Sequence, residues 1–168
     1  YDIVGFDPRG VAQSEPIQCF TPEELDANLA SDSKPDNDAE VAQSLVESEA
    51  FAKKCLEKTE HLEHFTTIET ARDMDILREA LGEEKLHYMG KSYGTYMGAL
   101  YASLFPNNIG RMILDGAVDP TISNLEQTKT QAVGFDNALQ AFIADCITQS
   151  SCPLPRDQKL ATEKVLSL

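Results

Sequence analysis

The sequence predicts an α/β fold whose core is a parallel sheet. Apolar runs over 1–7, 85–89 and 111–116 are typical of short buried strands, and Gly or Pro punctuates the end of each run. Helical patterns over 67–81 and from the turn after 89 to Phe105 alternate with these runs. Strands that alternate with helices form parallel sheets with right-handed crossovers, so the order of the elements indicates this fold class.

Residues 15–65 interrupt that order, and we interpret them as a helical insertion. The segment 21–24 combines a Thr cap, Pro at the first helical position and Glu three residues after the cap. This combination predicts a short helix that ends near Ala30. A second helix is expected over about 39–58, because apolar residues recur there at three- and four-residue steps. Its apolar face comprises Val41, Leu45, Ala52, Cys55 and Leu56.

Boundary signals frame the helices on either side of the 85–89 run. The segment 66–69 is a second capping box and opens the helix over 67–81, which Gly82 ends. The segment 106–108 contains a Pro and two Asn residues, so it breaks the later helix before the third apolar run begins.

The pattern is helical from Thr121 onward. A broad apolar stripe runs through 131–147, a turn follows at 152–155, and a last helix is expected from about Arg156. The stripe consists of Val133, Phe135, Leu139, Phe142, Ile143 and Cys146. Such a stripe more often belongs to a core than to a binding surface, so we assign it no chemistry.

Composition argues against several classes of partner. The 168 residues hold 14 Lys plus Arg against 28 Asp plus Glu, a formal net charge of −14. Nucleic acids and anionic membrane surfaces bind clustered positive charge, so neither is an expected partner. No apolar run approaches the roughly 18 residues of a membrane span, and no signal peptide is visible. Because residues 1–4 already fit the inside of a strand, we expect a cut rather than a natural N-terminus.

Four cysteines allow three disulfide pairings. The simplest is sequential, Cys19 with Cys55 and Cys146 with Cys152. The first bond would close a loop of 36 residues and contribute roughly 3–4 kcal/mol in the chain-entropy model. Disulfides would imply an oxidising compartment. The alternative is four buried free thiols in a cytosolic protein.

No metal site is predicted. The cysteines form no C-x-x-C motif and have no histidine beside them, which argues against zinc. The segment His61-Leu62-Glu63-His64 contains residue types that bind metals, but we favour a solvated loop there.

The stretch Gly90-Lys91-Ser92-Tyr93-Gly94 fits the pattern G-x-S-x-G between the second strand and its helix. A serine on such a sharp turn is held in a strained backbone conformation with its hydroxyl clear of the sheet. Gly90 and Gly94 meet the need for residues without a Cβ, because strand and helix backbones pass very close there. The backbone amide of Tyr93 would then face the position of an oxyanion. The alternative is an ordinary strand–turn–helix with a serine cap.

Two other pairs of polar residues follow strands. Asp7 and Arg9 stand at the carboxyl end of the first run, where open α/β sheets bind ligands. Asp115 and Asp119 follow the third run. For both pairs we favour the simpler role of bracing a turn with hydrogen bonds.

Several stretches together resemble the tripeptidyl-aminopeptidase-like α/β-hydrolases, exported serine exopeptidases of actinobacteria grouped with the prolyl aminopeptidases. The matching stretches are YDIVGFDPRGVAQS at 1–14, FTTIETARDMDILREAL at 65–81, KLHYMGKSYGTYMG at 85–98 and FPNNIGRMILDGAVDP at 105–120. The resemblance implies a partial α/β-hydrolase fold over 1–120, with strands four to six of eight. It implies the beginning of a helical cap, or lid, over 121–168.

The same resemblance implies Ser92 as the nucleophile and the Tyr93 amide as one oxyanion donor, and it gives Lys91 no role. The family's triad follows the order Ser, Asp, His. His61, His64 and His87 all precede Ser92, and His87 lies roughly 16 Å from it along an extended strand.

We therefore expect the catalytic Asp and His, the second oxyanion donor and the third strand to lie outside this chain. The third strand would separate strands four and five. The chain is expected to be a fragment that needs the missing segments of its own full-length protein, and to be inactive alone.

The predicted function is a secreted or cell-envelope serine exopeptidase that releases short peptides from substrates with a free N-terminus. An acyl-enzyme on Ser92 would form and be hydrolysed, with no cofactor. A carboxylate in the lid is expected to bind the substrate amine. An esterase or lipase on the same architecture is one alternative, and a non-catalytic binding module is another.

Overall fold

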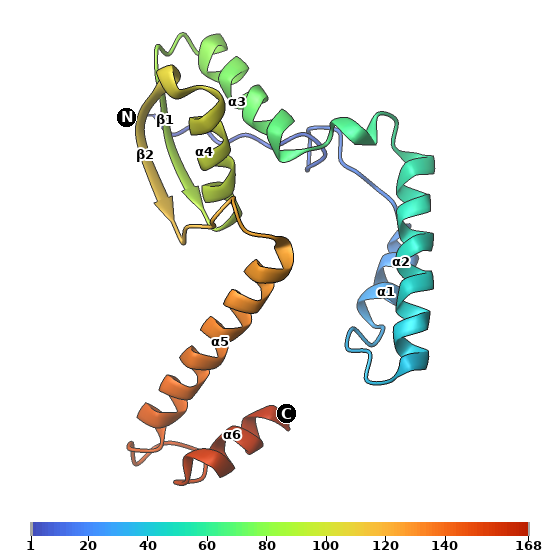
Figure 1. The fold of residues 1–168 in the computed structure, drawn as a ribbon, viewed down its shortest axis with the longest axis vertical. Coiled ribbons are helices and arrows are strands. Elements are labelled where there is room, and N and C mark those ends of the chain that lie inside the picture. Colours follow the sequence, from blue (N-terminus) through green and yellow to red (C-terminus); the bar gives the residue numbers. More distant parts are fainter. Residues whose placement is uncertain (1, 168) are drawn as a thin grey trace. The chain divides into compact units, whose positions relative to one another are not determined.

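The computed structural model describes residues 2–167, and the chain forms two compact units, 1–116 and 117–168 (Figure 1). The first unit holds the strands and helices α1 to α4, and the second holds α5 and α6. The division lies close to the boundary expected at 120. That the second unit is the beginning of a lid stays a prediction.

The first unit is organised around a two-stranded parallel sheet. Strand β1 spans Leu86–Lys91 and β2 spans Ile109–Asp115, with Met89 opposite Ile113 in the register. Helix α4, Tyr93–Leu104, and the 3₁₀ turn η2, Pro106–Asn108, connect them. Two parallel strands joined through a helix confirm the predicted α/β class.

Helix α4 lies between the sheet and helix α3, Thr67–Ala80 (Figure 1). Buried side chains from the two helices meet in a small core of Ala71, Met74, Met97 and Tyr101, where Ala71 and Tyr101 are fully buried. Apolar residues of the sheet and of the turn after α4 pack around this core: Leu86, Tyr88, Leu100, Phe105, Ile109 and Met112. One face of the sheet is therefore covered.

The other face of the sheet and the segment before it depart from the prediction. Met89 and Ile113 are 60% and 59% exposed, although parallel sheets are normally covered on both faces. The strand expected over 1–7 is wrong for the described part, because residues 2–7 belong to no helix or strand. An extended segment becomes a strand only by pairing, and β1 and β2 pair with each other.

The insertion folds as two helices. Helix α1 spans Pro22–Leu29 behind the predicted capping box of Thr21 and Glu24, and α2 spans Asp38–Lys58. A disulfide joins Cys19 to Cys55, and both cysteines are buried. The apolar face predicted for α2 is nevertheless largely exposed, because Cys55 is the one residue of that helix that is buried.

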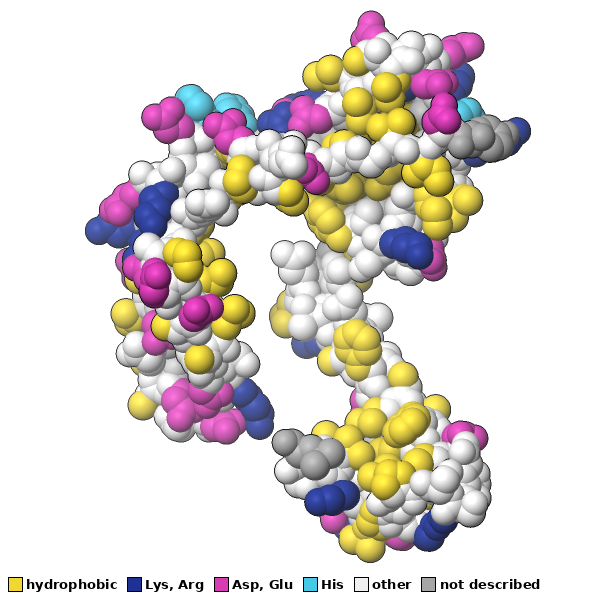
Figure 2. Space-filling model, turned by 180° about the vertical axis from the view of Figure 1, so that it is seen from behind, with side chains coloured by type: hydrophobic (Ala, Val, Ile, Leu, Met, Phe, Trp, Pro, Cys, Tyr) yellow, Lys and Arg dark blue, Asp and Glu magenta, His cyan; other side chains and the backbone are white. Residues whose placement is uncertain are grey.

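The second unit consists of α5, Asn124–Cys146, and α6, Gln158–Leu166, with a disulfide between Cys146 and Cys152. The prediction that the apolar stripe of α5 is core is wrong for three of its six members, and Leu139 and Cys146 are half-buried. Ile143 is fully buried, whereas Val133, Phe135 and Phe142 are 60% exposed or more. Within this unit α6 is the helix that packs on α5, and it is short. Figure 2 shows apolar side chains on the surfaces of both units.

Both disulfides follow the sequential pairing, and the structure contains no free cysteine among the described residues. Disulfide bonds persist in oxidising compartments. Within residues 2–167, no helix combines the length and the apolar character needed to cross a membrane.

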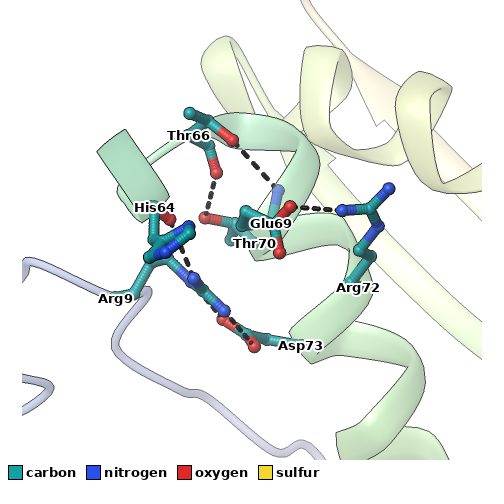
Figure 3. A network of polar contacts seen from close by, with 7 residues as sticks. All are labelled: Arg9, His64, Thr66, Glu69, Thr70, Arg72 and Asp73. Atoms are coloured by element: carbon teal, nitrogen blue, oxygen red, sulfur yellow. Dashed lines mark hydrogen bonds and ion pairs between the residues drawn. The ribbon is translucent and has the colours of Figure 1, made fainter. Parts of the chain in front are cut away.

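Arg9 ties the first loop to helix α3 (Figure 3). Its guanidinium donates to both carboxylate oxygens of Asp73, at 2.7 and 2.6 Å, and to the backbone oxygen of His64 at 2.8 Å. Asp7 accepts a hydrogen bond from the Gln13 amide at 3.2 Å, as expected for a turn brace. Arg9 does more than brace its own turn, because it joins segments 64 residues apart.

Asp75 holds the far end of α3 against α4. Its Oδ1 accepts hydrogen bonds from Arg78, from the Tyr101 hydroxyl and from the Asn108 amide, at 2.8 to 2.9 Å. The Arg78 hydrogen bond is the main reason that the pKa of Asp75 falls from an ordinary 3.8 to about 2. Burial, followed by the bond to Asp75, raises the pKa of Tyr101 to about 12.

Candidate active site

Ser92 stands between the last residue of β1 and the first residue of α4, and it is exposed. Its backbone has φ 49° and ψ −117°, a combination that residues other than Gly rarely adopt. Such strain persists only where the surrounding structure enforces it. The sequence predicted this strained strand-to-helix turn, and the structure contains it.

The glycines around Ser92 have measurable reasons to be glycine. A Cβ built on Gly90 would lie 2.4 Å from the backbone oxygen of Gly94, closer than any real contact of that kind. A Cβ on Gly94 would lie 3.2 Å from the Tyr88 hydroxyl, and one on Gly98 would lie 2.8 Å from Leu114 and Tyr88 side chains. The backbones of strand and helix thus pass very close at Gly90 and Gly94, as the sequence predicted, whereas Gly98 faces side chains of the sheet.

Hydrogen bonds fix the turn on both sides. The Ser92 amide donates to the Asp115 carbonyl on β2 at 2.9 Å. The Ser92 carbonyl accepts from the amide and the hydroxyl of Thr95, at 2.9 and 2.7 Å. The Tyr88 hydroxyl donates to the Gly94 carbonyl at 2.7 Å. The backbone of Ser92 is therefore held by the sheet below it and by the helix that follows.

The amide of Tyr93 is the first of α4, so it has no acceptor inside the helix. Amides at a helix N-terminus and the helix dipole both favour negative charge, which makes this end of α4 suited to an oxyanion. The Tyr93 side chain is 56% exposed, and its hydroxyl lies 2.6 Å from the hydroxyl of Thr67 on α3. Tyr93 also stacks on Tyr96, with ring centroids 6.1 Å apart.

The three histidines of the chain lie on β1 and in the connection between α2 and α3. His87 lies on β1, and its Nδ1 accepts a hydrogen bond from the Arg111 amide at 2.9 Å. His61 and His64 flank the 3₁₀ turn η1, Leu62–His64, in the connection between α2 and α3. Within residues 2–167, no hydrogen bond joins any of the three to the Ser92 hydroxyl.

Asp119 accepts hydrogen bonds through its carboxylate, whereas Asp115 contributes its backbone oxygen. Asp119 accepts from both the amide and the hydroxyl of Thr121, at 2.8 and 2.7 Å, and the hydroxyl bond is the main cause of its lowered pKa. This confirms the turn-bracing role predicted for Asp119. Asp115 ends β2 opposite Lys91, and its backbone oxygen is what holds Ser92.

Two hollows of about 710 and 760 Å³ lie in the surface of the first unit. The first is lined by the loop around Asp7 and Arg9 and by residues of α3, and the second lies beside the start of α1. Neither is lined by Ser92 or Tyr93. Ser92 itself is exposed.

Sequence reasoning identified the serine and its glycines but missed two side chains that support them. Tyr88 touches the Cβ positions of Gly90, Gly94 and Gly98 and bonds the helix backbone. Its position four residues before Ser92, on the strand face that turns toward the helix, was a usable signal. Thr67 belongs to a segment recognised for its helix cap, and nothing in the sequence links it to Tyr93.

Comparisons with known proteins agree with this geometry. The family described as "alpha/beta hydrolase fold" matches residues 1–167. The chain is 42% identical over 172 residues to the protein named "Serine protease Hip1" from Mycobacterium tuberculosis, covering 100% of this chain and 33% of that protein. It is 47% identical over 122 residues to "Tripeptidyl aminopeptidase" from Streptomyces lividans, covering 72% of this chain and 23% of that protein.

A third relative has a different name. "Carboxylesterase B" from Mycobacterium tuberculosis is 38% identical over 160 residues, covering 94% of this chain and 31% of that protein. The chain thus spans a third or less of the length of each of these relatives.

Proposed function

The chain belongs to the alpha/beta hydrolase fold family, and on that premise we propose that it contributes the nucleophile, Ser92, to a serine exopeptidase. The observation that most supports this role is the strained backbone of Ser92, φ 49° and ψ −117°, at an exposed strand-to-helix turn. The relatives named as a serine protease and an aminopeptidase support the class of activity.

In the proposed reaction the Ser92 oxygen attacks the carbonyl carbon of the scissile peptide bond. The serine proton passes to a histidine base outside these residues and then to the leaving amine, while the Tyr93 amide donates to the oxyanion. The acyl-enzyme on Ser92 is then attacked by water, which releases the carboxylic acid and restores the hydroxyl. No cofactor takes part in either step.

The proposed substrate is a peptide with a free N-terminus. The similarity to a tripeptidyl aminopeptidase supports this choice, and a carboxylate of the lid would bind the substrate amine. We propose that residues 121–168, which lie in the second unit, begin that lid. The two disulfides support a secreted or cell-envelope location.

An esterase is the second candidate, because one relative is named a carboxylesterase. Both activities use the same nucleophile and the same acyl-enzyme, so the geometry at Ser92 does not separate them. The substrate must separate them instead.

The test compares three substrates on the protein purified from its source. One is a tripeptide anilide with a free amine, the second is the same anilide with an acetylated amine, and the third is a short acyl ester. The Ser92→Ala variant is the control for all three. We expect hydrolysis of the free anilide, with kcat/KM at least about tenfold above the acetylated one, since a lost charge-assisted contact costs 1.4 kcal/mol or more.

Ester hydrolysis without anilide hydrolysis would establish the esterase candidate in place of the peptidase. Equal rates on the free and acetylated anilides would remove the free N-terminus from the proposal. Turnover that survives Ser92→Ala would overturn the role of Ser92 itself.

A further inference from the structure

Three side chains that commonly bind metals converge in the connection between α2 and α3. His61 and Glu63 approach to 3.7 Å between Nδ1 and Oε1, and His64 and Glu63 approach to 3.9 Å between Nε2 and Oε1. One ligand atom from each residue lies within 4.8 Å of the other two. All three side chains are exposed, between 63% and 74%, so they are open to solutes. In the sequence this segment shows residue types that bind metals, but a solvated loop is the favoured interpretation.

The two imidazoles lie near each other across a short turn, with ring centroids 5.9 Å apart. His64 ends η1, and His61 is the residue immediately before it. His61 adopts a left-handed backbone conformation, φ 57° and ψ 32°, and its carbonyl accepts from the His64 amide at 2.9 Å. The Phe65 amide closes the turn on the Leu62 carbonyl at 3.1 Å.

The turn is also held from outside. The Arg9 guanidinium donates to the His64 carbonyl at 2.8 Å, and Asp73 fixes that guanidinium with two further hydrogen bonds (Figure 3). The backbone between the possible ligands is thus pinned, while the side chains remain free to rotate. Figure 2 shows histidine side chains beside acidic ones on the surface. A site on a fixed backbone loses less entropy when its ligands close on an ion.

The types of donor atom select the class of ion. Two imidazole nitrogens and one carboxylate suit zinc and the later first-row divalent ions, whereas calcium and magnesium prefer oxygen ligands alone. Around a tetrahedral zinc with bonds of about 2.0–2.1 Å, ligand atoms stand about 3.4 Å apart. The three donors are within about 1.5 Å of that spacing, which exposed side chains reach by small rotations.

We propose that His61, Glu63 and His64 form a surface site for one divalent transition-metal ion of the zinc type. Two imidazoles and one carboxylate bind the ion, and water completes its coordination. The site shares no residue with the turn at Ser92, so the proposal does not depend on the proposed peptidase activity. Ion binding would stabilise the conformation of the connection between α2 and α3 that the Arg9 hydrogen bond to His64 already supports.

The test is calorimetric titration of the purified protein with Zn²⁺, in a buffer that does not bind the metal. The variants are His61→Gln, His64→Gln and the double variant. Glu60→Gln is the matched control, because it removes a neighbouring exposed carboxylate that is outside the site. Circular dichroism establishes that each variant keeps the helices of the parent.

We expect one Zn²⁺ per chain, at least about tenfold weaker binding in each single variant, and no binding in the double variant. Glu60→Gln should bind Zn²⁺ as the parent does, within about twofold. The proposal is overturned if the parent binds no Zn²⁺, or if the double variant binds it as tightly as the parent. It is equally overturned if Glu60→Gln weakens binding as much as the histidine variants, since the ion would then respond to general negative charge.

Discussion

The turn at Ser92 and helix α5 differ in how fully the described residues determine them. At the turn, a Cβ on Gly90 would lie 2.4 Å from a backbone oxygen, and backbone hydrogen bonds fix Ser92 from both sides. On α5, Phe135 is 73% exposed, and a Cβ on Gly134 would meet nothing within 4 Å. The turn at Ser92 thus has no room for an added atom at Gly90, whereas α5 has apolar side chains that are exposed.

This difference separates the geometry of the turn at Ser92 from the shape of the surface around it. The turn needs β1, β2 and α4, which pack together in the first unit, so its strain is maintained locally. The stripe on α5 is apolar but unpartnered among the residues described in its own unit. The strained turn can therefore be predicted from a short stretch of sequence, whereas a substrate pocket needs surfaces from several stretches.

Among the substitutions considered, Gly90→Ala is expected to lower the free energy of unfolding most, because it places a Cβ at the tightest contact of the turn. The added Cβ has backbone rather than a flexible side chain in its way, so strand and helix must separate. We expect a loss of about 3 kcal/mol or more in the free energy of unfolding. Urea denaturation followed by circular dichroism measures it.

Gly134→Ala is the matched control on the other side of the comparison. The site is open and helical, so Ala should stabilise the protein by up to about 1 kcal/mol through helix propensity. Similar losses for both substitutions would mean that the close approach at Gly90 is not what distinguishes the turn.

Asp75→Asn has the next largest expected effect. It tests the hydrogen bonds that hold the C-terminal part of α4 and the turn after it to α3. The substitution removes the carboxylate that Arg78, Tyr101 and Asn108 share, and we expect a loss of about 1–2 kcal/mol at pH 7. The pKa of Asp75 is about 2 in the folded protein, below its ordinary 3.8. Its contribution is therefore fully present above about pH 4 and lost as the pH falls toward 2.

The measurement is the difference in unfolding free energy between the parent and Asp75→Asn, by urea denaturation at pH 7 and at pH 2. The difference should shrink at the lower pH. A difference that stays constant between the two would show that the carboxylate charge does not stabilise the fold.

Local signals in the sequence predicted much of this structure. Helix caps at Thr21 and Thr66, and the glycines around Ser92, act through contacts a few residues away, so their positions follow from spacing alone. Which apolar residues are buried could not be predicted from spacing in the same way. The stripe on α5 and the run over 1–7 have the apolar pattern of core elements, yet a pattern does not reveal whether a partner surface is present.

Contacts between distant segments were also beyond the sequence. Arg9 was predicted to brace its own turn, but its partner Asp73 is 64 residues away. The convergence of His61, Glu63 and His64 depends on a left-handed residue that no motif marks. The Arg9–Asp73 contact depends on how the chain folds back on itself, and the histidine cluster on a local backbone conformation; spacing in the sequence encodes neither.

Arg9→Lys is expected to lower the free energy of unfolding by a smaller amount. Lys keeps the charge but lacks the planar fork that bonds both oxygens of Asp73, and it cannot also reach His64 in the same way. Because the pair is about one-third exposed, we expect a loss of only about 1 kcal/mol in unfolding free energy. A double-mutant cycle with Asp73→Asn measures the coupling, and zero coupling would mean that the pair is incidental.

The smallest expected effect belongs to Phe135→Ser on α5. A side chain that is 73% exposed loses little by becoming polar, so unfolding free energy should change by no more than about 0.5 kcal/mol. A loss above about 2 kcal/mol, measured by urea denaturation, would show that Phe135 is buried in the protein. The contrast between the turn and α5 would then disappear.

The most direct test of the central claim, that the strained turn makes Ser92 a nucleophile, is covalent labelling with a fluorophosphonate. The protein is purified from its source, labelled, and analysed by intact mass and by peptide mapping, beside the Ser92→Ala variant. The account predicts one adduct per molecule, located on Ser92 and absent from the variant. A folded protein that takes up no label, or a variant that is labelled as well as the parent, would contradict it.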